Sequence, residues 1–313
     1  MNRPAIEAVG LVKAYGDVRV LDRVDVRVDR GTVFALLGPN GAGKTTMVRI
    51  LATLTRADAG VARVAGFDVV RERHEVRSRI SLTGQYAAVD AALTAAENLV
   101  MMGRLTGLGR ARARSRAGEL LERFDLVAAA GRRVATFSGG MRRRLDLAAG
   151  LVGRPAVVFL DEPTTGLDPR SRQQTWELVA DLAGSGTTIF LTTQYLEEAD
   201  RLAHRIAVLD RGLVVAQGTS AELKTRVAER RLDLVLSDRG AFDRANRVLG
   251  RRAVRVSVGD LSVGVATDGS AAQIRSLLDE LDPARTDVAT FAVHTATLDD
   301  VFLALTGKDP AHV

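Results

Sequence analysis

The stretch that decides the fold is Gly38-Pro39-Asn40-Gly41-Ala42-Gly43-Lys44-Thr45-Thr46. It matches the phosphate-loop pattern G-x-x-x-x-G-K-S/T at every fixed position. A short apolar run over 32–37 precedes it and predicts a buried strand, and 46–51 predicts a helix. In that context the glycines let backbone N–H groups converge on one anion, at the positive end of the helix dipole. We therefore expect all nine residues to contact the phosphates of a nucleoside triphosphate.

Two side chains of this stretch have roles of their own. Lys44 places a positive charge beside the outer phosphates, and the Thr45 hydroxyl is suited to Mg²⁺. The alternative is a glycine-rich turn between strand and helix that contains lysine by chance. The complete pattern, together with its flanking strand, favours the phosphate loop.

A second buried strand is predicted over 156–160, and it ends in Asp161-Glu162-Pro163. Two adjacent carboxylates at the carboxyl end of such a strand match the Walker B arrangement. We expect Asp161 to hold Mg²⁺ and Glu162 to orient and polarise the attacking water. A surface Asp-Glu turn is the alternative, and the apolar run before it argues against a surface position.

Three further candidates remain ambiguous from residue type and position alone. Tyr15 could stack on adenine or pack over a hairpin, and Gln85 could reach a metal or water or be an ordinary loop residue. Ser138-Gly139-Gly140 opens a predicted helix, where the serine is a natural N-cap and the uncovered N–H groups could hold a second anion.

Composition limits the classes of protein that remain. The chain has 313 residues, 46% of them hydrophobic. This is enough to form two domains, each with a hydrophobic core. Without cysteine, disulfides and thiolate chemistry are excluded. No signal-peptide core and no membrane-spanning run is recognised, so we expect a chain that is soluble or held at a membrane by something else. The net charge is +6, and nearly all of the basic residues are arginines. No run of basic residues is interleaved with aromatic residues, so no nucleic-acid partner is expected.

Alternating and helical patterns divide the chain in two. Residues 1–225 fit an α/β nucleotide fold, with β-rich runs at its start and a helical subdomain over about 86–150. Residues 226–313 fit a small α+β accessory domain without a catalytic cluster.

Taken in order, these motifs resemble the nucleotide-binding subunit of an ABC transporter, over residues 5 to about 225. Within that superfamily the chain is similar to the daunorubicin-resistance type of ATP-binding protein. The segments that carry this closer likeness are Gly84-Gln85-Tyr86-Ala87-Ala88-Val89-Asp90, Glu97-Asn98-Leu99 and Thr192-Thr193-Gln194-Tyr195-Leu196-Glu197-Glu198-Ala199. Residues 101–105 and the motif at 297–302 near the end of the chain also share it.

The resemblance implies a fold and resolves the ambiguous residues. The fold would be a P-loop NTPase of ABC type, with a RecA-like core, an antiparallel β-subdomain and a helical subdomain. Tyr15 would stack on adenine, and Gln85 would link Mg²⁺ to the helical subdomain that touches the permease. Ser138, Gly139 and Gly140 would grip ATP held by a second copy.

The resemblance also implies partners and a place in the cell. Two copies would sandwich ATP head to tail, with Asp168 at their interface. The homodimer would energise efflux of a drug or lipid-like substrate through a separately encoded permease, at the cytoplasmic face of the membrane. An ABC-type ATPase of translation or DNA repair is a rival, but this chain has a single nucleotide domain.

Two positions depart from the pattern of most relatives. Met141 follows Ser138-Gly139-Gly140 where glutamine is usual, and Gln194 stands where the switch histidine is usual. Glutamine can donate a hydrogen bond to the γ-phosphate but cannot take a proton, which leaves Glu162 as the candidate general base. Lys44 and Gln194 are the other two candidate catalytic residues. The alternative is a regulatory ATP-binding protein with little hydrolysis.

Overall fold

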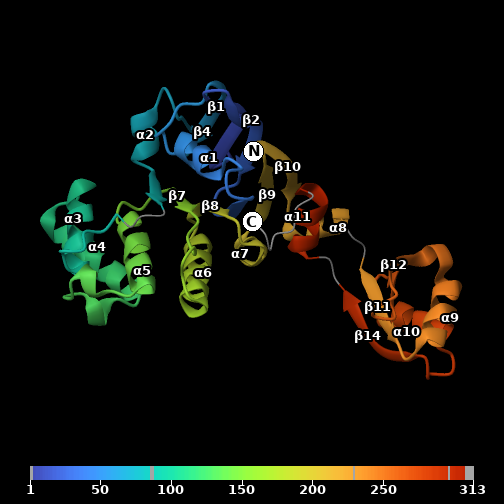
Figure 1. The fold of residues 1–313 in the computed structure, drawn as a ribbon. Helices are drawn as coiled ribbons and strands as arrows, with labels where there is room; N and C mark the ends of the chain where they lie inside the picture. Colours follow the sequence, from blue (N-terminus) through green and yellow to red (C-terminus); the bar gives the residue numbers. More distant parts are fainter. Residues whose placement is uncertain (1–2, 85–87, 228–229, 295–296, 307–313) are drawn as a thin grey trace. The chain divides into compact units, whose positions relative to one another are not determined.

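The computed structural model describes residues 3–84, 88–227, 230–294 and 297–306. The chain divides into two compact units, residues 1–220 and 221–312, which are described separately (Figure 1). No helix among the described residues is long and apolar enough to cross a bilayer.

A six-stranded sheet with the order β10-β9-β3-β8-β7-β6 forms the centre of unit 1. β3 runs parallel to both of its neighbours, and only β10 is paired antiparallel, to β9. β3, β7 and β8 are buried along their whole length, as their apolar sequences predict. The strands are β3 (Val33–Leu37), β6 (Ile80–Thr83), β7 (Val157–Asp161), β8 (Thr188–Thr193), β9 (Arg205–Asp210) and β10 (Leu213–Gly218).

Helices and aromatic rings hold this sheet together. Phe34 of β3 stacks on Phe190 of β8 with ring centroids 5.4 Å apart, and Phe159 of β7 contacts the same ring. Because consecutive parallel strands need a crossover, helices connect them. These are α1 (Lys44–Leu51), α6 (Pro169–Gly184) and α7 (Leu196–Leu202). The predicted α/β class is therefore confirmed.

A second, antiparallel sheet with the order β2-β1-β4-β5 lies beside α1. Its apolar side chains, among them Ile6 and Leu21, form one core with those of β3 and α1, among them Met47. Its strands are β1 (Ile6–Tyr15), β2 (Val18–Val28), β4 (Ala59–Val64) and β5 (Phe67–Asp68), followed by the short helix α2 (Arg73–Arg77).

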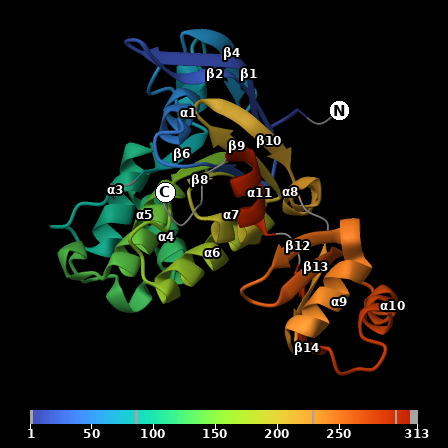
Figure 2. The same cartoon turned by 45° about the vertical axis from the view of Figure 1, so that its right-hand side comes forward.

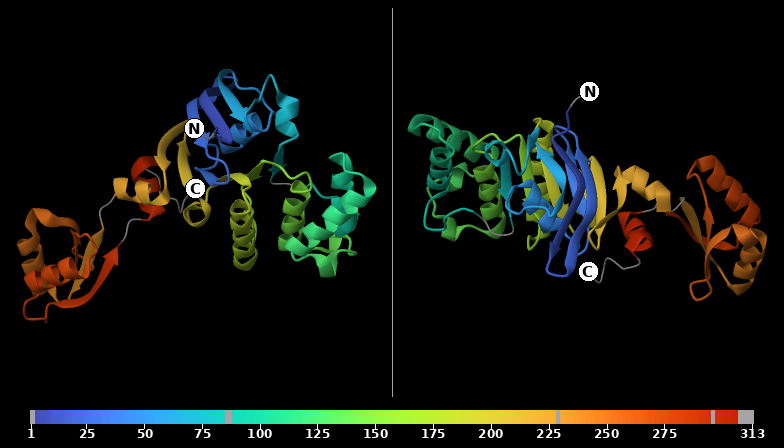
Figure 3. Two further views of the ribbon diagram at one scale, coloured as in Figure 1. Left: turned by 180° about the vertical axis from the view of Figure 1, so that it is seen from behind. Right: turned by 90° about the horizontal axis from the view of Figure 1, so that it is seen from above.

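Three helices make up the helical region of unit 1, which Figure 3 shows apart from the antiparallel sheet. They are α3 (Ala95–Leu105), α4 (Arg110–Arg123) and α5 (Gly139–Gly150). Thr94 and Glu97 form a capping box at the start of α3. The second helix, α4, begins at Arg110 and ends at Arg123, within the region predicted to be helical. The first half of α4 is rich in arginine, and the buried side of the helix is formed by Ala113, Ala117, Leu120 and Leu121.

Unit 2 holds a four-stranded antiparallel sheet with the order β12-β13-β11-β14. Helices α9 and α10 pack on it through a separate apolar cluster that includes Leu234, Phe242 and Leu277 (Figure 2). The strand β14 was not predicted, because its exposed residues show no apolar alternation. The elements are α8 (Ser220–Val227), β11 (Arg231–Leu236), α9 (Arg239–Leu249), β12 (Ala253–Ser257), β13 (Ser262–Ala266), α10 (Ala271–Leu281), β14 (Val288–His294) and α11 (Leu298–Thr306).

Candidate active site

The phosphate loop connects β3 to α1, and its glycines are required by close backbone approaches. A Cβ on Gly38 would lie 2.2 Å from the Leu209 carbonyl oxygen, and one on Gly43 would lie 2.6 Å from that of Val20. Gly43 also has a φ of 110°, which disfavours any side chain. No side chain caps α1. Since the first N–H groups of a helix lack internal partners, this end has free donors for an anion.

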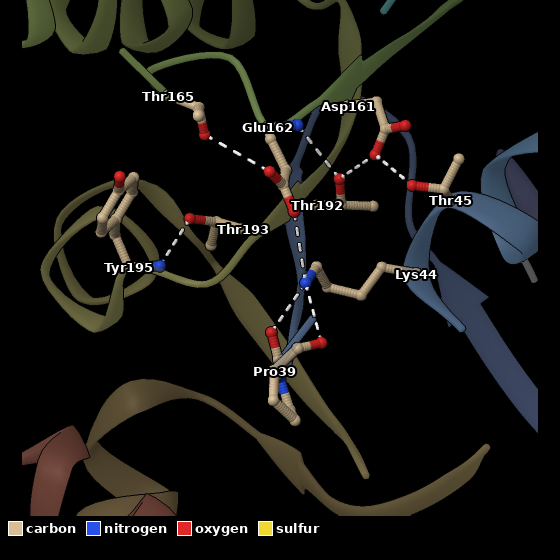
Figure 4. A network of polar contacts seen from close by, with 10 residues as sticks. Pro39, Lys44, Thr45, Asp161, Glu162, Thr165, Thr192, Thr193 and Tyr195 are labelled. Atoms are coloured by element: carbon tan, nitrogen blue, oxygen red, sulfur yellow. Dashed lines mark hydrogen bonds and ion pairs between the residues drawn. The ribbon is translucent and has the colours of Figure 1, made fainter. Parts of the chain in front are cut away.

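Lys44 lies inside this loop with its ammonium group held by three oxygens. Nζ donates to the Gly38 carbonyl oxygen at 2.8 Å and to that of Pro39 at 3.1 Å, and lies 3.3 Å from Glu162 Oε1 (Figure 4). Burial lowers the pKa of Lys44, while the charges of Glu162 and Asp161 oppose that shift. The two carboxylates therefore help to keep a buried ammonium charged.

Asp161 joins the loop to the neighbouring strand. Its Oδ1 accepts hydrogen bonds from the Thr192 hydroxyl at 2.5 Å and from the Thr45 hydroxyl at 3.3 Å. Thr192 lies on β8, beside Asp161 in the parallel register. The carboxylate is thus fixed next to the phosphate-loop hydroxyl, as expected for residues at the carboxyl ends of adjacent strands.

Glu162 follows directly and has a strained backbone, with a φ of 50°. Its N–H donates to the carbonyl oxygen and to the hydroxyl of Thr192, both at 3.1 Å. Oε1 faces Lys44, and Oε2 accepts from the Thr165 hydroxyl at 3.4 Å. This left-handed turn directs the carboxylate of Glu162 toward Lys44, while that of Asp161 faces Thr45 (Figure 4).

Gln194 follows β8, one strand away from the two carboxylates. Its Oε1 is buried and has no hydrogen-bond partner among the described residues. The next residue is fixed, because the Tyr195 N–H donates to the Thr193 hydroxyl at 2.9 Å. The amide of Gln194 therefore retains a free acceptor.

The donor set fits a magnesium ion shared with phosphate. Among the described residues, no group of three or more His, Cys, Asp or Glu side chains could hold a metal unaided. One carboxylate, Asp161, lies beside one hydroxyl, Thr45, and Mg²⁺ is usually bound by one or two carboxylates together with substrate phosphates.

A second group of predicted residues lies outside this network of polar contacts. Ser138 caps α5 by accepting from the Met141 N–H at 3.2 Å. Asp168 caps α6, where its carboxylate accepts from the N–H of Ser171 at 3.0 Å and from its hydroxyl at 2.6 Å. A Cβ on Gly140 would lie 2.6 Å from the Ser171 hydroxyl, so the two helix starts approach closely.

Two predicted residues stand apart from both groups. Tyr15 ends β1 with 48% of its surface exposed. Gln85 lies outside the described residues.

Sequence reasoning missed two buried polar residues, Thr192 at the site and Glu198 on the helix that follows β8. Thr192 was the detectable one, because a threonine near the end of an otherwise apolar strand has a hydroxyl that needs a partner. Glu198 gave no signal, since its position on α7 suggests an exposed face. It is fully buried and accepts from the Trp176 indole N–H at 3.0 Å.

Comparison with known proteins assigns the family. Residues 21–165 match the family model described as ABC transporter. The chain is 51% identical to the daunorubicin resistance ATP-binding protein DrrA3 of Streptomyces coeruleorubidus, over 99% of this chain and 98% of the relative. It is 50% identical to the daunorubicin/doxorubicin resistance ATP-binding protein DrrA of Streptomyces peucetius, over 97% and 92%.

A solved structure described as the ATP-binding subunit of an ABC transporter is similar over 71% of this chain and 92% of its own, with a TM-score of 0.64 and 28% identity. The nucleotide site and these matches agree. The chain belongs to the ABC transporter family and is related over nearly its full length to the daunorubicin resistance ATP-binding proteins.

Proposed function

We propose that this chain is the ATPase of an exporter, that it works as a homodimer, and that it drives efflux of a drug or lipid-like molecule through a separately encoded permease. The observation that supports this most is the position of Glu162. Its carboxylate lies 3.3 Å from the phosphate-loop lysine and directly after the Mg²⁺-binding candidate Asp161. The names of the relatives support the drug class.

In the proposed reaction each side chain has one task. Lys44 exchanges its loop carbonyl partners for phosphate oxygens and neutralises their charge. Glu162, released from Lys44, orients the attacking water and accepts its proton. Gln194 donates a hydrogen bond from its amide NH₂ group to the γ-phosphate. Asp161 and Thr45 would hold Mg²⁺, which neutralises charge on the transferring phosphoryl group.

A second copy is required to complete this site. Ser138, Gly140 and Asp168 take no part in the polar network around Lys44, although α5 offers N–H donors behind its cap. A head-to-tail pair, closed by two-fold symmetry, would place these groups against ATP bound by the partner. Tyr15 would hold the adenine of the ATP bound in its own copy.

A cleft in unit 1 is our candidate for the permease contact, which would hold the chain at the cytoplasmic face of the membrane. It has a volume of about 930 Å³ and lies between β6 and the helical region. Its walls combine apolar side chains with arginines, among them Met102, Leu105, Arg112, Arg116 and Arg154. It also includes Thr83 and Ala88, which lie on either side of the segment that contains Gln85.

The test compares phosphate release by wild type and Glu162→Gln, with oligomeric state followed in ATP and Mg²⁺. We expect wild type to turn over and the variant to stall as an ATP-loaded dimer. The proposal fails if the variant hydrolyses ATP at the wild-type rate. It also fails if wild type reconstituted with its permease binds ATP without hydrolysing it.

A regulatory ATP-binding protein with little turnover is the second candidate. Gln194 favours it, because glutamine stands where a switch histidine is usual and cannot take a proton. Steady-state phosphate release in the presence of the permease separates the two candidates.

A further inference from the structure

A lysine lies over one face of the ring of Tyr15, an exposed residue. Lys13 Nζ lies over the ring, 5.3 Å from its centroid. The same ammonium donates to Asp58 Oδ1 at 2.7 Å, and Asp58 Oδ2 accepts from the Ala14 N–H, also at 2.7 Å. One carboxylate thus holds the residue before Tyr15 by its backbone and the residue two before it by its side chain.

Asp58 is itself fixed by the sheet. Its N–H donates to the Val12 carbonyl oxygen at 2.8 Å, and β4 begins at the next residue, Ala59, which pairs with Val12. Hydrogen bonds from Lys13 and then from the Ala14 N–H lower the pKa of Asp58, so its carboxylate stays ionised at neutral pH. The carboxylate is therefore a permanent partner for the lysine.

The sheet places this group beside the phosphate loop. Lys13 pairs with Leu21 across the β1–β2 hairpin, and Val20 and Leu21 are the residues that a Cβ on Gly43 would strike. Tyr15 is two residues farther along the same strand, roughly 7 Å beyond Lys13. Tyr15 therefore lies on the β1–β2 hairpin, and this hairpin contacts the phosphate loop.

We infer that Lys13 and Asp58 are positioning residues for base recognition: they hold the Tyr15 ring as a fixed platform for the adenine of ATP. This rests on the proposed role of Tyr15. A ring at the end of a hairpin, with 48% of its surface exposed, loses rotamer and backbone freedom when a base stacks on it. The carboxylate fixes the backbone beforehand, and the ammonium holds one side of the ring through a cation–π contact.

The test measures dissociation constants for Mg·ATP and for Mg·tripolyphosphate, which has the phosphates but no base. Tyr15→Ala should raise the dissociation constant of ATP by roughly 5- to 150-fold, the range of base–aromatic stacking. Lys13→Met should raise it by roughly 2- to 5-fold, as for an exposed cation–π contact, and Asp58→Asn should raise it as well. None of these variants should change the affinity for tripolyphosphate.

Two further variants identify the cause. Lys13→Arg keeps the ion pair and the cation, so it should restore most of the ATP affinity lost in Lys13→Met. In the Tyr15→Ala background, Lys13→Met should have no further effect, because there is no ring left to hold. Glu75→Gln, which removes the exposed ion pair with Arg79 near α2, is the matched control and should leave both affinities unchanged.

Three results would overturn the inference. Equal losses for ATP and tripolyphosphate would show that the pair acts through the phosphate loop or the fold. Unchanged ATP affinity in both Lys13→Met and Asp58→Asn would show that it does not act at all. Unchanged affinity in Tyr15→Ala would remove Tyr15 as the platform, while phosphate release, measured separately, would still decide the proposed ATPase function.

Discussion

Replacing the buried glutamate Glu198 tests how the two helices beyond the catalytic strands are held together. Its carboxylate is fully buried on α7 and accepts the indole N–H of Trp176 on α6 at 3.0 Å. Glu198→Met leaves that buried donor without an acceptor, which costs about 1–3 kcal/mol of unfolding free energy. For a unit of this size the loss lowers the unfolding temperature by roughly 2–10 °C.

The pH dependence of stability provides a second, independent readout. Burial raises the pKa of Glu198, and the hydrogen bond from the Trp176 indole N–H only partly opposes this shift. The folded protein therefore holds this proton more tightly than the unfolded chain. Its contribution to stability is complete below the ordinary glutamate pKa and is lost as pH rises through the raised value. Glu198→Gln keeps an acceptor and removes the titration, so its stability relative to wild type should improve as pH rises.

The assay is thermal unfolding followed by tryptophan fluorescence, from weakly acidic to weakly alkaline pH. Trp176 is the only tryptophan of the chain, so the signal reports unit 1 alone. Glu197→Gln, at the exposed neighbouring position, is the matched control. The reasoning is refuted if Glu198→Met unfolds at the temperature of that control, or if Glu198→Gln keeps the pH profile of wild type.

Two further predictions concern the active site. Thr192→Val removes the hydroxyl that donates to Asp161 at 2.5 Å, and we expect roughly a 10- to 100-fold loss of ATPase activity; an unchanged turnover number at saturating Mg²⁺ would contradict this. Gly140→Ala places a Cβ 2.6 Å from the Ser171 hydroxyl, so we expect weaker ATP-dependent dimerisation in light scattering, whereas Gly118→Ala on α4 has open space and should behave as wild type. Equal dimerisation by both glycine variants would show that the close approach at Gly140 does not matter.

The unpredicted parts of the site follow from contacts between distant segments. Lys13 and Asp58 are 45 residues apart, and Thr45 meets Asp161 across 116. Neither Lys13 nor Asp58 belongs to a motif, and each alone resembles an ordinary surface charge. Only the antiparallel pairing of β1 with β4 brings them together next to Tyr15.

The local motifs could be predicted from sequence because each is formed by residues that are close together in the chain. The phosphate loop over 38–46 needs only its own glycines and the helix that follows, and Asp161-Glu162 needs only the buried strand before it. Tertiary structure decided which residues contact one another: Lys44 contacts Glu162, and Asp161 contacts Thr192. It also decided that Glu198 is buried against Trp176. The reason is that backbone preferences act over a few residues, whereas burial and polar pairing depend on which distant strands and helices pack side by side.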